Sequence, residues 1–218
     1  MNGKCIGLWM ALAAALCTQL QASAQTVGLA AGPDTTYRLR VRRVADTVVA
    51  HIRWARNERD RADLALDVLD MRGDVVRTYK QRLKLAPNTD AQARFVLNPA
   101  QDLGLDSATF YYALTSNLSC NCEDQSAIVL PAHPDSYTWP EPGLEVSLKT
   151  FRSKTFVLLR TANVATNVRL TLPPGHPRWR LADNGLDLLP GQEAEVEILG
   201  MAPGEPLKPA DIGVEWRK

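Results

Sequence analysis

Apolar and polar residues alternate with a period of two along most of this chain, which restricts its possible folds more than any other feature. In the clearest example, Tyr37, Leu39 and Val41 alternate with Arg38, Arg40 and Arg42. One face of such a strand would be apolar and the other basic. Successive side chains of a β-strand point to opposite faces, so this pattern predicts half-buried strands. Stripes with helical spacing are scarce, and we expect one short helical turn near Pro99–Leu103. The chain is therefore predicted to be all-β, with antiparallel sheets.

Turn-forming residues divide these strands into two groups. Met71-Arg-Gly-Asp74 predicts a hairpin turn before the strand Val75–Leu85, because Gly accepts positive φ and Asp hydrogen-bonds locally. Prolines then cluster in the segment Pro131–Pro142, which cannot be a central strand because proline lacks a backbone donor. We place a domain boundary here and predict two β-sandwich domains, residues 25–135 and 136–218.

The first 24 residues predict an export signal that is cleaved from the mature protein. Lys4 provides a basic start, Ile6–Leu16 is an apolar run, and Ala22-Ser23-Ala24 is a small-residue cleavage site. The run is shorter than the roughly 20 residues that a membrane-spanning helix needs. We expect a secreted or periplasmic protein with no membrane association after cleavage, and an uncleaved anchor is the alternative.

Charge and cysteine content argue against several classes of protein. The chain has 25 Lys and Arg residues against 24 Asp and Glu residues, and it becomes neutral when Lys4 leaves with the signal. A neutral chain has no overall attraction to nucleic acid or anionic membrane, so we expect neither as a partner. Of the 4 cysteines, Cys5 and Cys17 lie in the signal. Stability must therefore come from buried apolar surface rather than from a disulfide framework.

The segment Ala182–Ile198 carries the most specific pattern. Asp183-Asn-Gly185 predicts a tight turn, Leu186–Leu189 a short buried strand and Pro190-Gly191 a second turn. The strand that follows is expected to bury Ala194, Val196 and Ile198 and to expose Glu193, Glu195 and Glu197. The whole segment closely resembles the signature near the end of the β-mannosidases of glycoside hydrolase family 2.

This resemblance implies two immunoglobulin-like sandwiches. In those enzymes the signature belongs to a C-terminal immunoglobulin-like domain, and Phe151–Leu172 is similar to the central strand pair of that domain. Leu64–Val76 and Leu83–Thr89 resemble the immunoglobulin-like domain that precedes it. The resemblance covers residues 37–218, and in the family both domains lie outside the catalytic barrel.

The catalytic part of the family has no counterpart in this sequence. The resemblance implies two catalytic glutamates at strand ends of a (β/α)8 barrel, which needs about 250 residues and alternating helices. No residue here matches the motif of either glutamate, so we predict no catalytic residue and no cofactor. Glu193, Glu195 and Glu197 are interpreted as a solvated strand face rather than as paired carboxylates.

Tyr137 and Trp139 are the candidate carbohydrate-binding residues, because sugar rings stack on flat apolar faces and the proline-rich segment can expose them. The alternative is that both rings pack at the domain junction. Trp54, Trp179 and Trp216 lie on predicted strands and are expected to pack in the core or between domains. The row Arg38, Arg40 and Arg42 is interpreted as a solvated face. An acidic glycan is its alternative ligand, which nearby acidic residues and the neutral net charge disfavour.

Cys120 and Cys122 are candidates for a local disulfide, which would be tight and readily reduced in an oxidising compartment. They could also bridge to another chain. The histidines do not cluster, and no second cysteine pair completes a zinc-binding pattern, so we predict no metal site.

Together these observations predict an exported, non-catalytic module with a structural or accessory role in glycan handling. Its expected partners are a glycan or another protein domain. The alternatives are a truncated β-mannosidase gene product that carries an inherited hydrolase annotation, a carbohydrate-binding protein that uses Tyr137 and Trp139, and a periplasmic assembly or adhesion module.

Overall fold

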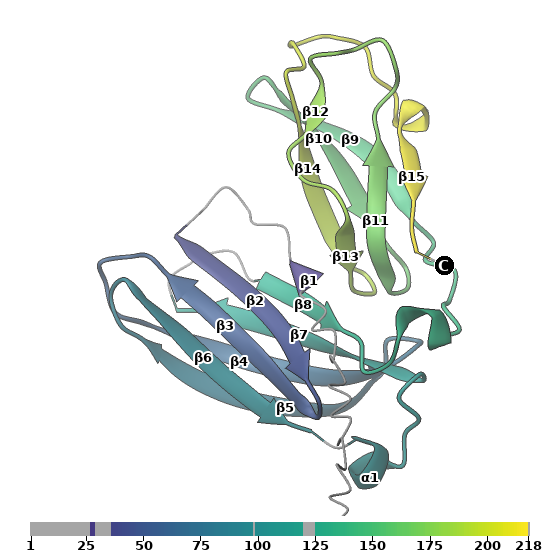
Figure 1. Ribbon diagram of the computed structural model, residues 1–218. Coiled ribbons are helices and arrows are strands. Elements are labelled where there is room, and N and C mark those ends of the chain that lie inside the picture. The colour runs from purple at the N-terminus through teal and green to yellow at the C-terminus, as the bar shows by residue number, and fades with distance from the viewer. Residues whose placement is uncertain (1–26, 29–35, 98, 120–124, 218) are drawn as a thin grey trace, which may run out of the picture.

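The computed structural model describes residues 27–28, 36–97, 99–119 and 125–217. These residues form two β-sandwiches that follow one another along the chain (Figure 1). The predicted all-β class is confirmed, and so are the antiparallel pairings on which it rests. The predicted signal peptide, residues 1–24, lies outside the described residues.

The first sandwich consists of two four-stranded sheets, with strand orders β1-β2-β3-β6 and β5-β4-β7-β8. Its strands are β1 (Val27–Gly28), β2 (Tyr37–Val44), β3 (Thr47–Trp54), β4 (Asp60–Asp70), β5 (Val75–Leu85), β6 (Thr89–Val96), β7 (Phe110–Leu118) and β8 (Gln125–Val129). The turn predicted at Met71–Asp74 connects β4 to β5, where Gly73 has a φ of 91°. The short helix α1 (Pro99–Leu103) connects β6 to β7, as the sequence predicts.

The alternation of apolar and polar residues along the strands builds the core of the first sandwich. Leu64, Leu66 and Val68 on β4 are at most 1% exposed and face the inner side chains of β2 and β3. Trp54 closes one end of this core at 1% exposure, and its indole Nε1 donates to the carbonyl of Glu58 at 2.8 Å. The predicted core position of Trp54 is therefore confirmed.

The second sandwich has one four-stranded sheet, with order β12-β14-β10-β9, and one three-stranded sheet, with order β13-β11-β15. Its strands are β9 (Glu145–Phe151), β10 (Lys154–Arg160), β11 (Ala165–Thr171), β12 (Arg180–Leu181), β13 (Leu186–Leu188), β14 (Glu193–Leu199) and β15 (Gly213–Glu215). Val157, Leu159, Val168 and Val196 form the centre of its core. Trp179 and Trp216 also pack in this core.

A segment without strands, residues 130–144, connects β8 to β9 and contains the short 3-10 helix η1 (Pro134–Ser136). A second 3-10 helix, η2 (Pro209–Asp211), precedes β15. The predicted boundary near residue 136 falls within the connecting segment, and its position stays a prediction. No helix among the described residues is long and apolar enough to cross a membrane.

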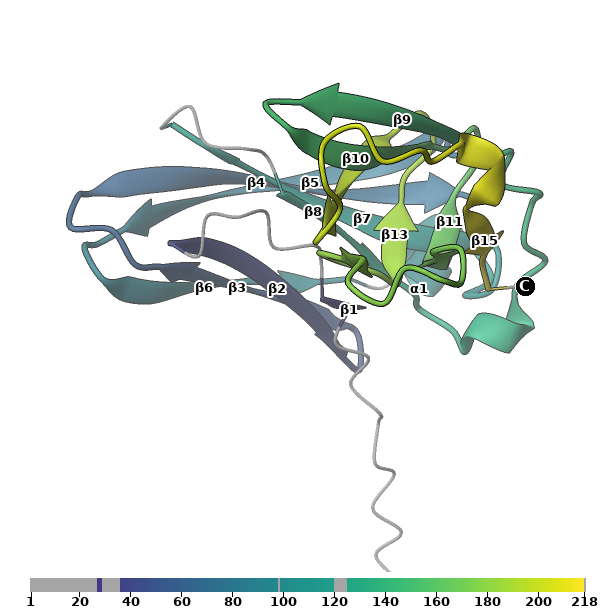
Figure 2. The same ribbon diagram turned by 90° about the horizontal axis from the view of Figure 1, so that it is seen from above.

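The two sandwiches meet through a third apolar cluster. Tyr111 on β7 and Ile128 on β8 point outward from the first sandwich, yet they are 0% and 2% exposed. Val164 from the loop before β11 packs against them, and Leu189 from the loop after β13 covers the edge of the cluster. Figure 2 shows the second sandwich lying on the side of the first that contains β4 and β7, away from β2 and β3. The outer face of the sheet β5-β4-β7-β8 is therefore partly buried between the two sandwiches.

Candidate functional site

Tyr137 and Trp139 lie side by side in the connecting segment, with ring centroids 5.1 Å apart. The Tyr137 hydroxyl donates to the carbonyl of Ser107 at 3.0 Å and accepts from the backbone N–H of Ala132 at 3.0 Å. The Trp139 indole donates to the carbonyl of Pro134 at 2.9 Å. Each aromatic ring therefore holds the connecting segment in place through its polar atom.

The exposure of these two rings differs. Tyr137 is 7% exposed, and burial raises the pKa of its hydroxyl to about 12. Trp139 is half-buried and packs at the edge of the apolar cluster between the sandwiches. A sugar ring needs an open aromatic face, so the burial of Tyr137 favours the packing interpretation for that residue. The carbohydrate-binding role of the pair stays a prediction, which now rests on the open part of Trp139.

The turn Pro190-Gly191 of the signature segment lies at the junction between the sandwiches. A Cβ atom placed on Gly73, in the turn between β4 and β5, would lie 2.7 Å from Cγ of Pro190. Gln192 extends the contact, because its side-chain amide donates to the Ser126 hydroxyl at 3.4 Å. The two turns that stand out in the sequence, at residues 71–74 and 190–191, therefore pack against one another.

The other half of the signature supports strand β11. The Asn184 side chain pairs with both backbone groups of Leu170, accepting from its N–H at 2.8 Å and donating to its carbonyl at 2.9 Å. Asp187 accepts from the backbone N–H of Asn167 at 2.8 Å, at a β-bulge where Asn167 has a φ of 51°. Sequence reasoning assigned Asn184 only to a turn and gave Asp187 no role, since a partner some 14 to 20 residues away leaves no local signal.

Asp187 has the most perturbed carboxyl group among the described residues with a resolved shift. Burial raises its pKa from 3.8 to about 6, while the hydrogen bond from Asn167 and the charge of Arg217 oppose the rise. A perturbed carboxyl can indicate catalysis, but structural groups are perturbed in the same way. The hydrogen-bond donor to Asp187 described above is the backbone N–H of Asn167 on β11, which favours the structural interpretation.

Two of the three glutamates in the acidic row on β14 form ion pairs with lysines. Glu195 lies 2.6 Å from Lys149 Nζ, and Glu197 lies 3.0 Å from Lys154 Nζ. Glu193 and Glu195 are exposed, in agreement with the predicted solvated face. Within the described residues, no group of three or more His, Cys, Asp or Glu side chains could hold a metal ion.

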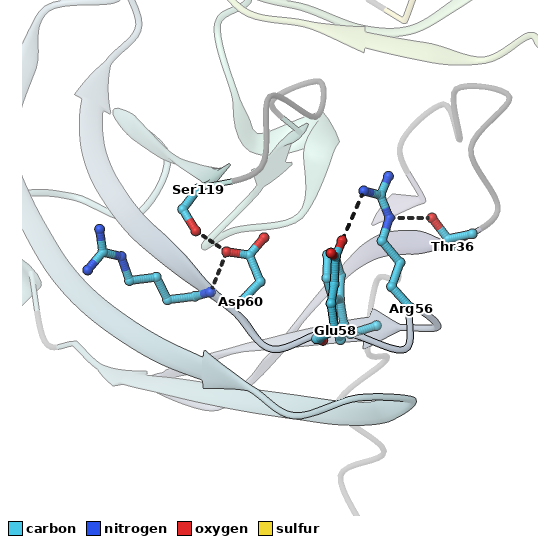
Figure 3. A network of polar contacts seen from close by, with 7 residues as sticks. Thr36, Arg56, Glu58, Asp60 and Ser119 are labelled. Carbon is cyan, nitrogen blue, oxygen red and sulfur yellow. Dashed lines mark hydrogen bonds and ion pairs between the residues drawn. The ribbon is translucent and has the colours of Figure 1, made fainter.

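A polar network surrounds the end of the first sandwich that Trp54 closes (Figure 3). Arg56 donates to the Thr36 hydroxyl at 3.0 Å, lies 3.7 Å from the carboxylate of Glu58 and stacks 5.3 Å above the Trp54 ring. Ser119 donates to the carboxylate of Asp60, which also accepts from the N–H of Arg61 at 2.7 Å. These contacts fix the loop between β3 and β4, so we assign the network to structure. Cys120 and Cys122, the candidate disulfide, lie outside the described residues.

Two apolar-cored sandwiches joined by an apolar junction define the class: a pair of immunoglobulin-like β-sandwich domains. Residues 139–210, about a third of the chain, match the family model Ig_mannosidase, which describes an Ig-fold domain. The resemblance of the second domain to the immunoglobulin-like domain of β-mannosidases, predicted from the signature segment, is thereby confirmed.

Solved structures share the fold of both sandwiches. The β-D-mannosidase of Dictyoglomus thermophilum matches 83% of this chain with a TM-score of 0.62 and 10% identity. The exo-chitosanase CsxA of Amycolatopsis orientalis matches 83% of this chain with a TM-score of 0.52 and 12% identity. The match covers 21% and 25% of those two chains, so this chain spans no more than about a quarter of either protein. No curated protein sequence matches the chain.

Proposed function

We propose that this chain is an exported, non-catalytic module with a structural or accessory role in glycan handling. The observation that supports this proposal is the junction between the sandwiches. Tyr111, Ile128 and Val164 form an apolar contact between the two domains, and domains joined by an apolar contact are suited to holding a partner or ligand at a fixed position.

The fold gives a second line of support. Both solved proteins are named for action on glycans, one as a mannosidase and one as a chitosanase. A shared fold alone does not carry an activity, because function resides in sites placed on a fold. In this chain the acidic row on β14 forms ion pairs with Lys149 and Lys154, whereas a retaining glycosidase needs two free carboxyl groups about 5–5.5 Å apart.

The non-catalytic part of the proposal is tested by incubating the purified chain with an aryl β-mannoside. We expect no release of the aryl group above the buffer rate. Hydrolysis that elutes together with the chain through two chromatographic steps would overturn the proposal in favour of an enzyme. Sequencing the neighbouring DNA addresses the truncated-enzyme alternative, since an adjacent reading frame for a (β/α)8 barrel would identify a split gene.

The accessory part is tested by native electrophoresis in gels that contain one polysaccharide each, either neutral mannan or an acidic glycan. We expect at least one glycan to retard the chain. If no glycan retards it, the accessory role in glycan handling is wrong. The variant Trp139→Ala tests whether the glycan binds at the connecting segment or at another surface. Loss of retardation in mannan gels would assign binding to the Trp139 ring.

A further inference from the structure

The outer face of the sheet β2-β3-β6 carries five arginine residues that the fold itself does not use. They are Arg38, Arg40 and Arg42 on β2, Arg53 on β3 and Arg94 on β6, here called the arginine face. All five are exposed. None of their guanidinium groups forms an ion pair or donates a hydrogen bond to another residue in the part of the chain that the structure describes.

Strand register places these charges against one another. Arg38 lies directly opposite Arg53, and Arg40 lies directly opposite His51. Like charges directly opposite one another destabilise an antiparallel sheet. A sheet that keeps the Arg38–Arg53 pair, with Asp90 as the one carboxylate on this face within the described residues, is therefore suited to an external anion.

Not every acidic residue near this row in the sequence lies on the same face of the fold. Asp63 is on the other sheet of the first sandwich, where it pairs with Arg82 at 2.5 Å. Asp90, opposite Arg53, is the one carboxylate that register places among the three strands of the arginine face within the described residues. The small net charge of the chain, +1 at pH 7, thus conceals a strongly basic face.

The arginine face is also hollowed. A shallow depression of about 420 Å³ is lined by side chains that include Arg38, Arg40, His51 and Arg53. A second depression, bordered by Trp54 and Asn88, shares Arg53 and Asp90 with the first, so the two form one continuous strip. Along β2 the three arginines recur about every 6.7 Å, twice the rise per residue, which provides a row of cations for an extended polymer.

We propose that the arginine face binds an acidic polysaccharide, a chain of sugar rings with carboxylate groups, along the strip from Arg42 to Asn88. This inference rests on the proposed accessory role in glycan handling and names its ligand class. Guanidinium groups bind carboxylates through paired, charge-assisted hydrogen bonds. Asp90 and Gln92 supply acceptors and donors for sugar hydroxyl groups between the arginines.

Two other polyanions fit this face less well. Single-stranded nucleic acids are bound on aromatic platforms, and no outward residue of β2, β3 or β6 is aromatic. Peripheral membrane binding uses Trp, Phe or Leu anchors beside the basic residues, whereas the exposed apolar side chains near this face are Val44 and Val96.

The experiment measures binding of the full chain to polygalacturonate by titration calorimetry, with neutral mannan as the uncharged reference. The test variant is Arg40→Gln/Arg53→Gln. The matched control is Arg160→Gln/Arg178→Gln, which removes two exposed arginines from the second sandwich and changes the net charge equally. We expect affinity for polygalacturonate to fall about tenfold or more in the test variant and to change less than about twofold in the control. Binding should also weaken as salt is raised.

Several results would overturn the inference. An equal loss in both variants would indicate unspecific charge attraction, and no binding of wild type to polygalacturonate would exclude the ligand class. Stronger binding to phosphatidylserine vesicles or to single-stranded DNA, lost in the test variant, would assign the face to a membrane or to nucleic acid. Concentration-dependent dimerisation lost in the test variant would assign it to the acidic β14 face of a second copy. Retardation of the chain in mannan gels, without binding to polygalacturonate, would support the accessory role and reject an acidic polysaccharide as the ligand.

Discussion

Gly73 in the first sandwich lies so close to Pro190 in the second that a methyl group on Gly73 would contact the proline ring at 2.7 Å. Gly73 also has a φ of 91°, which side chains with a Cβ rarely adopt. Two separate constraints therefore require glycine at this junction.

Gly73→Ala is expected to destabilise the chain by about 2–4 kcal/mol, because the strained backbone and the collision with a rigid ring act together. Gly175→Ala is the matched control, since Gly175 has a φ of 97° and nothing within 4 Å of its added methyl group. It should cost only about 1–2 kcal/mol. Urea denaturation measures both variants. Equal losses would mean that Pro190 moves aside freely and that the junction is not tightly packed.

Tyr111→Phe is expected to stabilise the chain by about 0.5–1.5 kcal/mol. The Tyr111 hydroxyl is buried in the junction without a hydrogen-bond partner among the described residues, and burial raises its pKa. Removing this hydroxyl removes the desolvation cost. Tyr37→Phe provides the contrast, because it breaks a 2.6 Å bond to the buried Ser116 hydroxyl and should destabilise by about 1–3 kcal/mol. A loss of stability in Tyr111→Phe would reveal a partner for that hydroxyl, such as a bound water.

Asp187→Asn is expected to change how stability depends on pH. Because burial raises the pKa of Asp187 from 3.8 to about 6, the folded chain holds this proton more tightly than the unfolded chain. Unfolding therefore releases a proton between these values, and stability falls as the pH rises from about 4 to about 6. Asparagine keeps an oxygen acceptor for the N–H of Asn167 without the charge.

The variant should be more stable than wild type at pH 7.5, by about 1–2 kcal/mol, and equally stable near pH 3.5. Thermal unfolding across this range measures the difference. A wild-type advantage at pH 7.5 would mean that the ionised carboxylate gains more from Asn167 and Arg217 than it loses by burial.

Arg42→Gln is expected to raise the pKa of His51. Burial first, and then the Arg42 guanidinium, lower this pKa from 6.5, with Arg94 adding to the effect and Asp90 opposing it. Removing one cation should move the His51 imidazole back toward its ordinary value, as followed by its proton resonances in a pH titration. Saturating polygalacturonate should raise the pKa of His51 in wild type. An unchanged titration in Arg42→Gln would show that the arginine face is well screened by solvent.

Much of the fold could be predicted because most strands bury one face only. Period-two alternation located β2 and β5 and the turn between β4 and β5, and turn residues located the signature corner. The start of β6 at Thr89 is hard to predict because Asp90–Arg94 alternates polar residues with small alanines, which carry little apolar signal.

The junction between the domains could not be predicted from alternation, because outward residues are expected to meet water. A second signal was present in β7, where Phe110–Leu114 is apolar on both faces, the pattern of a strand covered on both sides. The arginine face was visible as a row on β2, but Arg53 and Arg94 join it only through strand pairing. Net charge counts residues without regard to the face on which they lie.

The junction also determines how this pair of domains can be inherited. Leu69, Ala113 and Ile128 face outward from the first sandwich and are covered only because the second sandwich lies over them. A gene fusion that broke the chain in residues 130–144 would leave these side chains exposed to water on a sheet surface, where they would promote aggregation. Recombination is therefore expected to move the two sandwiches together, as a single transferable unit.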